Sequence, residues 1–258
     1  MGLLAPLVAF REYFLSVIGG GSTPWTINGE EFRVDPRYRR DLGHEPDPAV
    51  AAIFRDRLKP GDVCFNVGAN VGRHVLQMAR RVGPTGRVVA FEPNPAAMSV
   101  LTSHVAMNGF ESRVTLVDAA VGAHTGRAIL HARGADQRAR LGSANDAFAK
   151  QIDQVERIEV PVVALDSWAA DHNLRPDWLV IDVEGFEEDV LRGAEALIGA
   201  QPNMGVIVEM HPASWSDIGT TQKSMAALIN QFGRRPVSLS GAPDPLNAHN
   251  LVLLEPAS

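Results

Sequence analysis

Short apolar runs alternate with longer amphipathic stretches along most of the chain. Runs rich in Val, Ile, Leu and Phe, each short enough for a buried strand, lie at 63–67, 87–91, 114–117, 178–181, 204–208 and 250–254. Between them, apolar residues recur at helical spacing over 71–82, 95–108, 186–198 and 223–232. Strands and helices that alternate in this way predict an α/β fold, a doubly wound sheet with helices on both faces.

Two parts of the chain depart from this alternation. Residues 125–132 and 156–165 are predicted as two further strands, and the polar segment near 133–156 as a loop insertion between them. The first 45 residues begin with an apolar, helix-like stretch and continue with short strands and loops. We therefore expect an N-terminal extension over 1–45, followed by one domain over 46–258. The extension is a candidate contact for substrate or for a second copy in a homodimer.

Composition narrows the class of protein. With 258 residues, 45% of them hydrophobic and 21% charged, the chain is typical of a globular protein. A formal net charge of -6 argues against nucleic acid as a partner, because phosphates require an excess of basic residues. The single cysteine, Cys64, lies within the first apolar run and is expected to be a buried packing residue.

No targeting or membrane segment is evident in the chain. No apolar run reaches the roughly 20 residues of a membrane-spanning helix. The N-terminal stretch lacks a basic start and is interrupted by Arg11 and Glu12, unlike a secretory signal. We therefore expect a cytoplasmic protein without a membrane span.

The first apolar run leads into a glycine-rich turn, FNVGANVG, at 65–72. Gly68 and Gly72 are spaced G-x-x-x-G, and Asn70 stands where a dinucleotide-binding turn has its middle glycine. No Lys-Ser or Lys-Thr pair follows, as a nucleoside triphosphate loop would require. A turn that allows close approach without phosphate contacts favours the aminoacyl part of S-adenosylmethionine. A nicotinamide-dependent oxidoreductase on the same fold remains the alternative.

Acidic residues end the second and third apolar runs. Glu92 follows the second run, where a carboxylate can accept hydrogen bonds from both hydroxyls of a ribose. Asp118 follows the third run, where its side chain and the neighbouring backbone can meet an adenine amino group. Together with the glycine turn, these positions outline a nucleoside-binding edge of the sheet.

A second acidic group follows the fourth and fifth apolar runs, in IDVEGFE and VEMHP. Asp182 and Glu184 end one run, and Glu209 and His211 end the next, so all four should face one crevice at the carboxyl ends of the strands. Such a set can act as a general base toward a hydroxyl or hold a divalent cation such as Mg²⁺. Glu187 and Glu188 are interpreted mainly as helix-start acids, and the other histidines as surface or packing residues.

These blocks together resemble the FkbM-type S-adenosylmethionine-dependent methyltransferases. The resemblance runs in order through FNVGANVG, GRVVAFEPNP, MNGF, VDAAVG, IDVEGFE and VEMHP, over about residues 60–212. It implies a Rossmann-like class I methyltransferase sheet and an O-methyltransferase. The implied acceptor is a hydroxyl of a small molecule or oligosaccharide. A saccharide or glycan is the first candidate, and a polyketide or peptide natural product is the second.

The resemblance also implies a role for each matching residue. The cofactor-binding residues would be Asn66, Gly68, Asn70, Gly72, Glu92, Asn94, Asp118 and Ala119. The acceptor pocket would be lined by Asp182, Glu184, Glu209 and His211. Of these, Glu184 would contact the substrate, whereas Asp182, Glu209 and His211 would be catalytic or would bind the metal.

Overall fold

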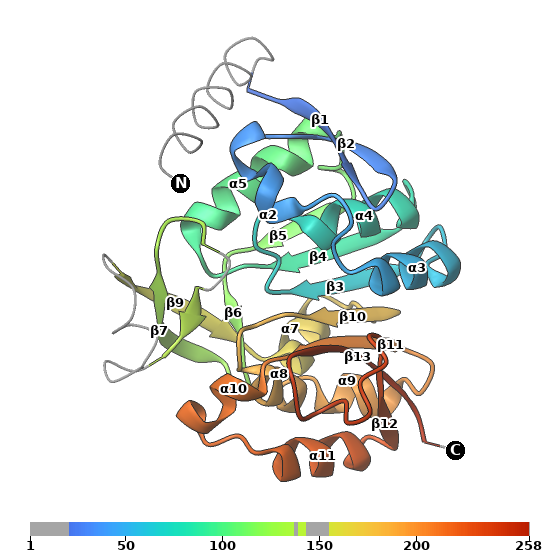
Figure 1. The fold of residues 1–258 in the computed structure, drawn as a ribbon, viewed down its shortest axis with the longest axis vertical. Helices are drawn as coiled ribbons and strands as arrows, with labels where there is room; N and C mark the ends of the chain where they lie inside the picture. Colours follow the sequence, from blue (N-terminus) through green and yellow to red (C-terminus); the bar gives the residue numbers. More distant parts are fainter. Residues whose placement is uncertain (1–20, 137–138, 143–154, 258) are drawn as a thin grey trace.

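A mixed seven-stranded sheet forms the centre of the computed structural model, which describes residues 21–136, 139–142 and 155–257. The strand order is β12-β13-β11-β10-β3-β4-β5 (Figure 1). The parallel strands are β3 (Val63–Val67), β4 (Arg87–Phe91), β5 (Val114–Val117), β10 (Trp178–Ile181) and β11 (Gly205–Met210). The strand β13 (Asn250–Pro256) runs antiparallel to both β11 and β12 (Arg234–Ser238). The predicted α/β sheet is confirmed.

Helices cover both faces of this sheet (Figure 1). One face packs against α3 (Pro48–Arg57), α4 (Arg73–Val82) and α5 (Pro95–Met107). The other packs against α7 (Leu165–Asp171), α8 (Glu187–Arg192), α9 (Glu195–Ala200) and α11 (Gln222–Gln231). Successive side chains of a strand point to opposite faces, so Cys64 and Phe65 are buried in two different cores. Burial on both faces explains why the strand sequences are apolar throughout.

A hairpin precedes the sheet in the chain. Its strands, β1 (Thr23–Ile27) and β2 (Glu30–Val34), are joined by Asn28 and Gly29, which have φ angles of 49° and 81°. Two residues with positive φ match the turn that fits the twist of a hairpin. The hairpin and the following η1 (Pro36–Tyr38) and α2 (Arg39–Leu42) pack on the α4–α5 face. The strands expected in the N-terminal extension are therefore present, whereas the helix expected before them lies outside the described residues.

A second sheet lies beside the carboxyl ends of the parallel strands, on the left of Figure 1. It consists of β6 (Ala120–Val121), β7 (Gly126–Ala132), β8 (Arg140–Leu141) and β9 (Glu156–Val163), in the order β6-β9-β7-β8. The predicted pair of strands at 125–132 and 156–165 corresponds to β7 and β9, which pair antiparallel. Residues 137–138 and 143–154 of the expected loop insertion lie outside the described residues.

The structure differs from the predicted elements in several places. The helix expected over 186–198 is divided into α8 and α9 at Gly193, where a Cβ would lie 2.1 Å from the carbonyl oxygen of Gly122. The pattern also missed α3, α7 and the polar edge strand β12. The remaining short elements are α10 (Pro212–Trp215) and η2 (Ser216–Ile218). Among the described residues, no helix is long and apolar enough to cross a membrane.

Candidate active site

Gly68 and Gly72 shape the turn between β3 and α4. Gly68 has a φ of 78°, and a Cβ at this position would lie 1.7 Å from the carbonyl oxygen of Asp182 at the end of β10. Gly72 has a φ of 101°, and its Cβ would lie 2.7 Å from Cδ1 of Leu101 on α5. Both positions need glycine, for its left-handed backbone and for its small size. The turn thereby brings the ends of β3 and β10 together.

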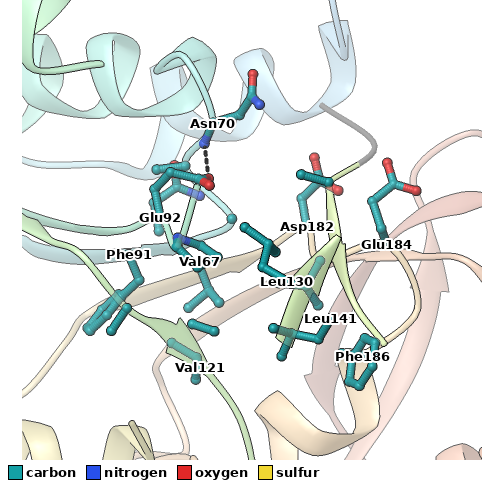
Figure 2. Close-up of a pocket in the computed structure, with 18 of the residues that line it drawn as sticks. Val67, Asn70, Phe91, Glu92, Val121, Leu130, Leu141, Asp182, Glu184 and Phe186 are labelled. Atoms are coloured by element: carbon teal, nitrogen blue, oxygen red, sulfur yellow. Dashed lines mark hydrogen bonds between the residues drawn. The ribbon is translucent and has the colours of Figure 1, made fainter. Parts of the chain in front are cut away.

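Glu92, at the end of β4, connects the glycine turn to the loop before α5. Its Oε2 accepts a hydrogen bond from the amide of Asn70 at 2.7 Å (Figure 2), and its Oε1 accepts one from the amide of Asn94 at 2.8 Å. Burial raises the pKa of Glu92 to about 7, and these two hydrogen bonds oppose the shift. Each carboxylate oxygen keeps a lone pair for a further donor.

A cavity opens between the glycine turn, the end of β10 and the second sheet. Its empty volume, with the open solvent at its mouth included, is about 880 Å³. The lining residues with amide or carboxylate side chains are Asp41, Asn66, Asn70, Glu92, Asp182 and Glu184. Apolar side chains lie below these groups in Figure 2: Phe91, Val121, Leu130, Leu141 and Phe186. The cavity thus has a polar side and an apolar side.

The first turn of α4 contributes a positive charge to the cavity. Arg73 is the single arginine or lysine among the described residues that line it. Its Nη1 lies 3.0 Å from Oδ2 of Asp47, and its Nη2 donates to the backbone carbonyl of Asp41 at 2.8 Å. These contacts hold the guanidinium at the end of the cavity nearest the N-terminal segment.

His211, directly after β11, lies among carboxylates. Its Nε2 is 3.9 Å from Asp182, 3.9 Å from Glu184 and 3.8 Å from Glu209, measured to the carboxylate oxygens. His249 joins the group, with its Nε2 2.5 Å from Oε1 of Glu209 and its ring stacked on that of His211 at a centroid distance of 4.7 Å. Because Asp182 and Glu184 also line the cavity, this acid–histidine cluster and the cavity share an edge.

Glu187, fully buried at the start of α8, orients the ring of His211. Its Oε1 lies 2.7 Å from Nδ1 of His211 and also accepts a hydrogen bond from the amide of Gly185. Its Oε2 accepts a hydrogen bond from Nε1 of Trp215 at 2.7 Å. A carboxylate at Nδ1 keeps the proton on that nitrogen, so Nε2 is the nitrogen that remains available to a ligand or metal.

The charges of the cluster shift its pKa values. Burial, followed by the charge of Glu209, raises the pKa of Asp182 well above its usual range, and burial also raises the pKa of Glu184. Burial alone lowers the pKa of His211, but its hydrogen bond to Glu187 and the surrounding carboxylates raise that pKa to about 9. The cluster therefore attracts protons, and a divalent cation can take their place.

Comparison with known proteins decides the family. The methyltransferase FkbM domain matches residues 66–236, which is more than half of the chain. The chain belongs to the FkbM methyltransferase family. The resemblance predicted from the motifs is therefore confirmed, and so is the enzyme class, an S-adenosylmethionine-dependent methyltransferase. Membership of this family decides against the alternative of a nicotinamide-dependent oxidoreductase.

Two related proteins match part of this FkbM methyltransferase. "Methyltransferase 1" from Beauveria bassiana is 28% identical over 144 residues, which cover 50% of this chain and 57% of that protein. "31-O-demethyl-FK506 methyltransferase FkbM" from Streptomyces tacrolimicus is 31% identical over 173 residues, which cover 55% of this chain and 66% of that protein. The matches thus span less than two thirds of each relative.

A solved structure is similar to this FkbM methyltransferase over most of its length. It is Aeropyrum pernix fibrillarin in complex with natively bound S-adenosyl-L-methionine, with 15% identity and a TM-score of 0.46. The similarity covers 91% of this chain and 82% of that one.

Most predicted site residues of the FkbM methyltransferase line the cavity, namely Asn66, Gly68, Asn70, Glu92, Ala119, Asp182 and Glu184. The others lie outside the lining. Gly72 packs on α5, Asp118 is exposed, and the side chain of Asn94 caps α5 by accepting from the amide of Ala96. Glu209 and His211 belong to the adjoining cluster, where His211 approaches the cavity-lining Asp182.

Sequence reasoning missed the contributions of Arg73, Glu187 and His249. The local pattern marks Glu187 only as a helix-start acid, and it does begin α8, but its carboxylate also holds His211. His249 lies 40 positions beyond Glu209, and no local spacing connects the two. Arg73 directly follows Gly72, so its place after the glycine turn is a signal that sequence reasoning can use.

Proposed function

We propose that this FkbM methyltransferase transfers the methyl group of S-adenosylmethionine to a hydroxyl oxygen of a saccharide or glycan-type acceptor. The observation that carries the proposal is the edge shared by the cavity and the acid–histidine cluster, where Asp182 and Glu184 belong to both. A hydroxyl is a weak nucleophile at neutral pH and needs a group that takes its proton. Carboxylates also suit a polyol, whose hydroxyls are hydrogen-bond donors. The Streptomyces relative is named for a 31-O-demethyl substrate, which supports oxygen as the acceptor atom.

The residues around the cavity fit S-adenosylmethionine. Glu92 would accept hydrogen bonds from the ribose hydroxyls, while Phe91 and Ala119 would contact the adenine. Gly68 keeps side-chain atoms out of the junction between β3 and β10. The buried Oδ1 of Asn66 has no hydrogen-bond partner among the described residues, which leaves it free to accept from a ligand. The cofactor supplies an electrophilic methyl carbon, and the protein's task is to hold the acceptor oxygen in line with it.

Asp182 is our candidate for the general base. It lines the cavity, and its raised pKa makes it a stronger base than an ordinary carboxylate. His211, kept protonated by Glu187, would stabilise the neighbouring carboxylates, and Glu209 would hold both His211 and His249. Glu184 would accept a hydrogen bond from a second hydroxyl of the acceptor and so orient it.

A divalent cation at Asp182, Glu209 and His211 is the alternative means of activation. His211 belongs to two groups of possible metal ligands, and within each group the ligand atoms lie within 4.8 Å of one another. One group adds Asp182 and Glu184, and the other adds Glu209 and His249. Carboxylate oxygens suit Mg²⁺ and Mn²⁺, whereas imidazole ligands favour a transition metal such as Zn²⁺ or Fe²⁺. A bound cation would lower the pKa of an acceptor hydroxyl.

A polyketide or peptide hydroxyl is the second candidate acceptor. The apolar side chains of Leu130, Leu141 and Phe186 line the cavity below Asp182 and Glu184, and they suit a scaffold less polar than a sugar (Figure 2). The name of the Streptomyces relative supports the same candidate.

The test is methyl transfer from S-adenosylmethionine to a panel of sugars, oligosaccharides and hydroxylated macrolides or peptides, with products analysed by mass spectrometry. Asp182→Asn should abolish turnover and retain binding of S-adenosylhomocysteine, while Asp171→Asn, at an exposed position of α7, should change neither. Methylation only at nitrogen or carbon would refute the proposal. Activity lost to a chelator and restored by Mn²⁺ or Mg²⁺ would assign the cluster to a metal, and activity unaffected by the chelator would assign Asp182 as the base.

A further inference from the structure

The residues proposed to hold the ribose and the adenine leave the methionine end of the cofactor without a partner. The methionine end of S-adenosylmethionine carries a carboxylate and an ammonium group on one carbon. The acids of the cluster repel a carboxylate, so it requires a cationic or amide-rich part of the cavity. Within the described lining, Arg73 is the side chain with a permanent positive charge.

We propose that Arg73 binds the α-carboxylate of S-adenosylmethionine and that Asn66 accepts a hydrogen bond from its α-ammonium. The two residues flank the glycine turn, since Asn66 lies on β3 and Arg73 begins α4. The proposal concerns the cofactor alone and holds for any acceptor.

The contacts of Arg73 orient its guanidinium without using all its donors. A guanidinium has five N–H groups in a planar fork. One nitrogen pairs with the carboxylate of Asp47 at 3.0 Å, and another donates to the backbone carbonyl of Asp41 at 2.8 Å. Both partners come from the segment before β3, so Arg73 is held in place from outside the sheet. No other described residue accepts from the remaining N–H groups, so they can bind a carboxylate, for which the fork geometry is well suited.

The backbone around Arg73 also favours an anion. Arg73 is the first residue of α4, and the N-cap residue is Gly72, which has no side chain that could cap the helix. The amides of the first turn lack intrahelical acceptors, and the helix dipole is positive at this end. A carboxylate bound beside Arg73 would meet both the guanidinium and these amides.

Asn66 provides an independent observation on the other side of the turn. Its side chain lines the cavity and is 1% exposed, and within the part of the chain that the structure describes its buried Oδ1 has no hydrogen-bond partner. Its Nδ2 donates to the carbonyl of Val180 at 3.4 Å, which fixes the amide with Oδ1 as the remaining acceptor. A buried acceptor without a donor is unfavourable, and an ammonium group supplies the missing donor.

The test compares three ligands by calorimetry: S-adenosylhomocysteine, its decarboxylated analogue, which keeps the amine, and 5′-methylthioadenosine, which lacks both groups. The wild type should bind S-adenosylhomocysteine about 10- to 100-fold more tightly than the decarboxylated analogue, as expected for a charge-assisted pair. Arg73→Met should abolish that preference and leave the affinity for 5′-methylthioadenosine unchanged. Asn66→Leu should abolish the preference for the decarboxylated analogue over 5′-methylthioadenosine.

Arg175→Met is the matched control, because Arg175 is an exposed arginine that does not line the cavity. This variant should keep the preference for S-adenosylhomocysteine. Equal affinity of the wild type for S-adenosylhomocysteine and its decarboxylated analogue would overturn the proposal whether or not the variants fold. Equal weakening of all three ligands by Arg73→Met would also overturn it, because that result assigns Arg73 to the structure of the site.

Discussion

Glu92 should make the folded protein less stable as the pH rises from about 4.5 to about 7. Its ordinary pKa is 4.5, and burial raises it to about 7 in the native state. Between these values the native protein binds more protons than the unfolded chain, so the free energy of unfolding falls with increasing pH. At about 1.4 kcal/mol per pKa unit, the loss amounts to about 3 kcal/mol once the pH has passed 7.

Glu92→Gln isolates this contribution. Glutamine cannot ionise, so the variant should lack the decline assigned to Glu92, while the other titrating groups change both proteins alike. The carboxylate of Glu92 accepts hydrogen bonds from the amides of Asn70 and Asn94. Glutamine would turn its amino group, which is itself a donor, toward one of these two amides. We therefore expect the variant to be less stable than the wild type near pH 4.5 and to regain about 3 kcal/mol relative to it by pH 8.

The assay is urea denaturation of both proteins at closely spaced values between about pH 4 and pH 8, with midpoints converted to free energies. A stability difference that stays constant over this range would refute the reasoning, because it would mean that Glu92 does not titrate there. A difference that changes in the opposite direction would show a lowered pKa for Glu92, with its two hydrogen bonds outweighing its burial.

Three further predictions, two of them with a comparison variant, concern the packing of the site and of the hairpin and use the same denaturation assay. Gly68→Ala should lower the free energy of unfolding by more than about 2 kcal/mol, because the new Cβ adds a backbone clash to the strain of a left-handed conformation. Gly61→Ala has the same strain but no clash, and it should lower the free energy of unfolding by about 1–2 kcal/mol. Equal costs would contradict the close approach at Gly68. Glu187→Leu should cost about 3–5 kcal/mol, and Trp215→Phe, which removes one of its donors, about 1 kcal/mol. A Glu187→Leu variant as stable as the wild type would disprove the role of that carboxylate. Gly29→Ala should cost about 1–2 kcal/mol in the turn between β1 and β2, and an unchanged midpoint would argue against its positive φ.

The parallel strands were predictable because they are buried on both faces. The runs at 63–67, 87–91, 114–117 and 178–181 coincide with β3, β4, β5 and β10. Strand β12 escaped prediction because it lies at the sheet edge and contains Arg234, Arg235 and Pro236, which give no continuous apolar run. The division between α8 and α9 was also hidden, since it depends on the approach of Gly193 to Gly122, far away in the sequence.

The cofactor side of the site followed from local order in the chain. A glycine turn after one strand and an acid after the next must meet at the carboxyl edge of a parallel sheet, so the sequence was sufficient to bring Gly68 and Glu92 to one cavity. The same rule brought Asp182 and Glu184 there. Family motifs in the same blocks then identified the chemistry as methyl transfer.

The acid–histidine cluster depended on three-dimensional packing. Glu187 reaches His211 from the start of a helix, and His249 reaches Glu209 from the segment before β13. Neither pair has a characteristic spacing, because side chains from different elements meet only after the helices have packed on the sheet. Strand alternation and strand-end motifs therefore specify the fold and the cofactor edge, whereas the orientation of His211 and the partners of Arg73 arise from long-range contacts that no local pattern records.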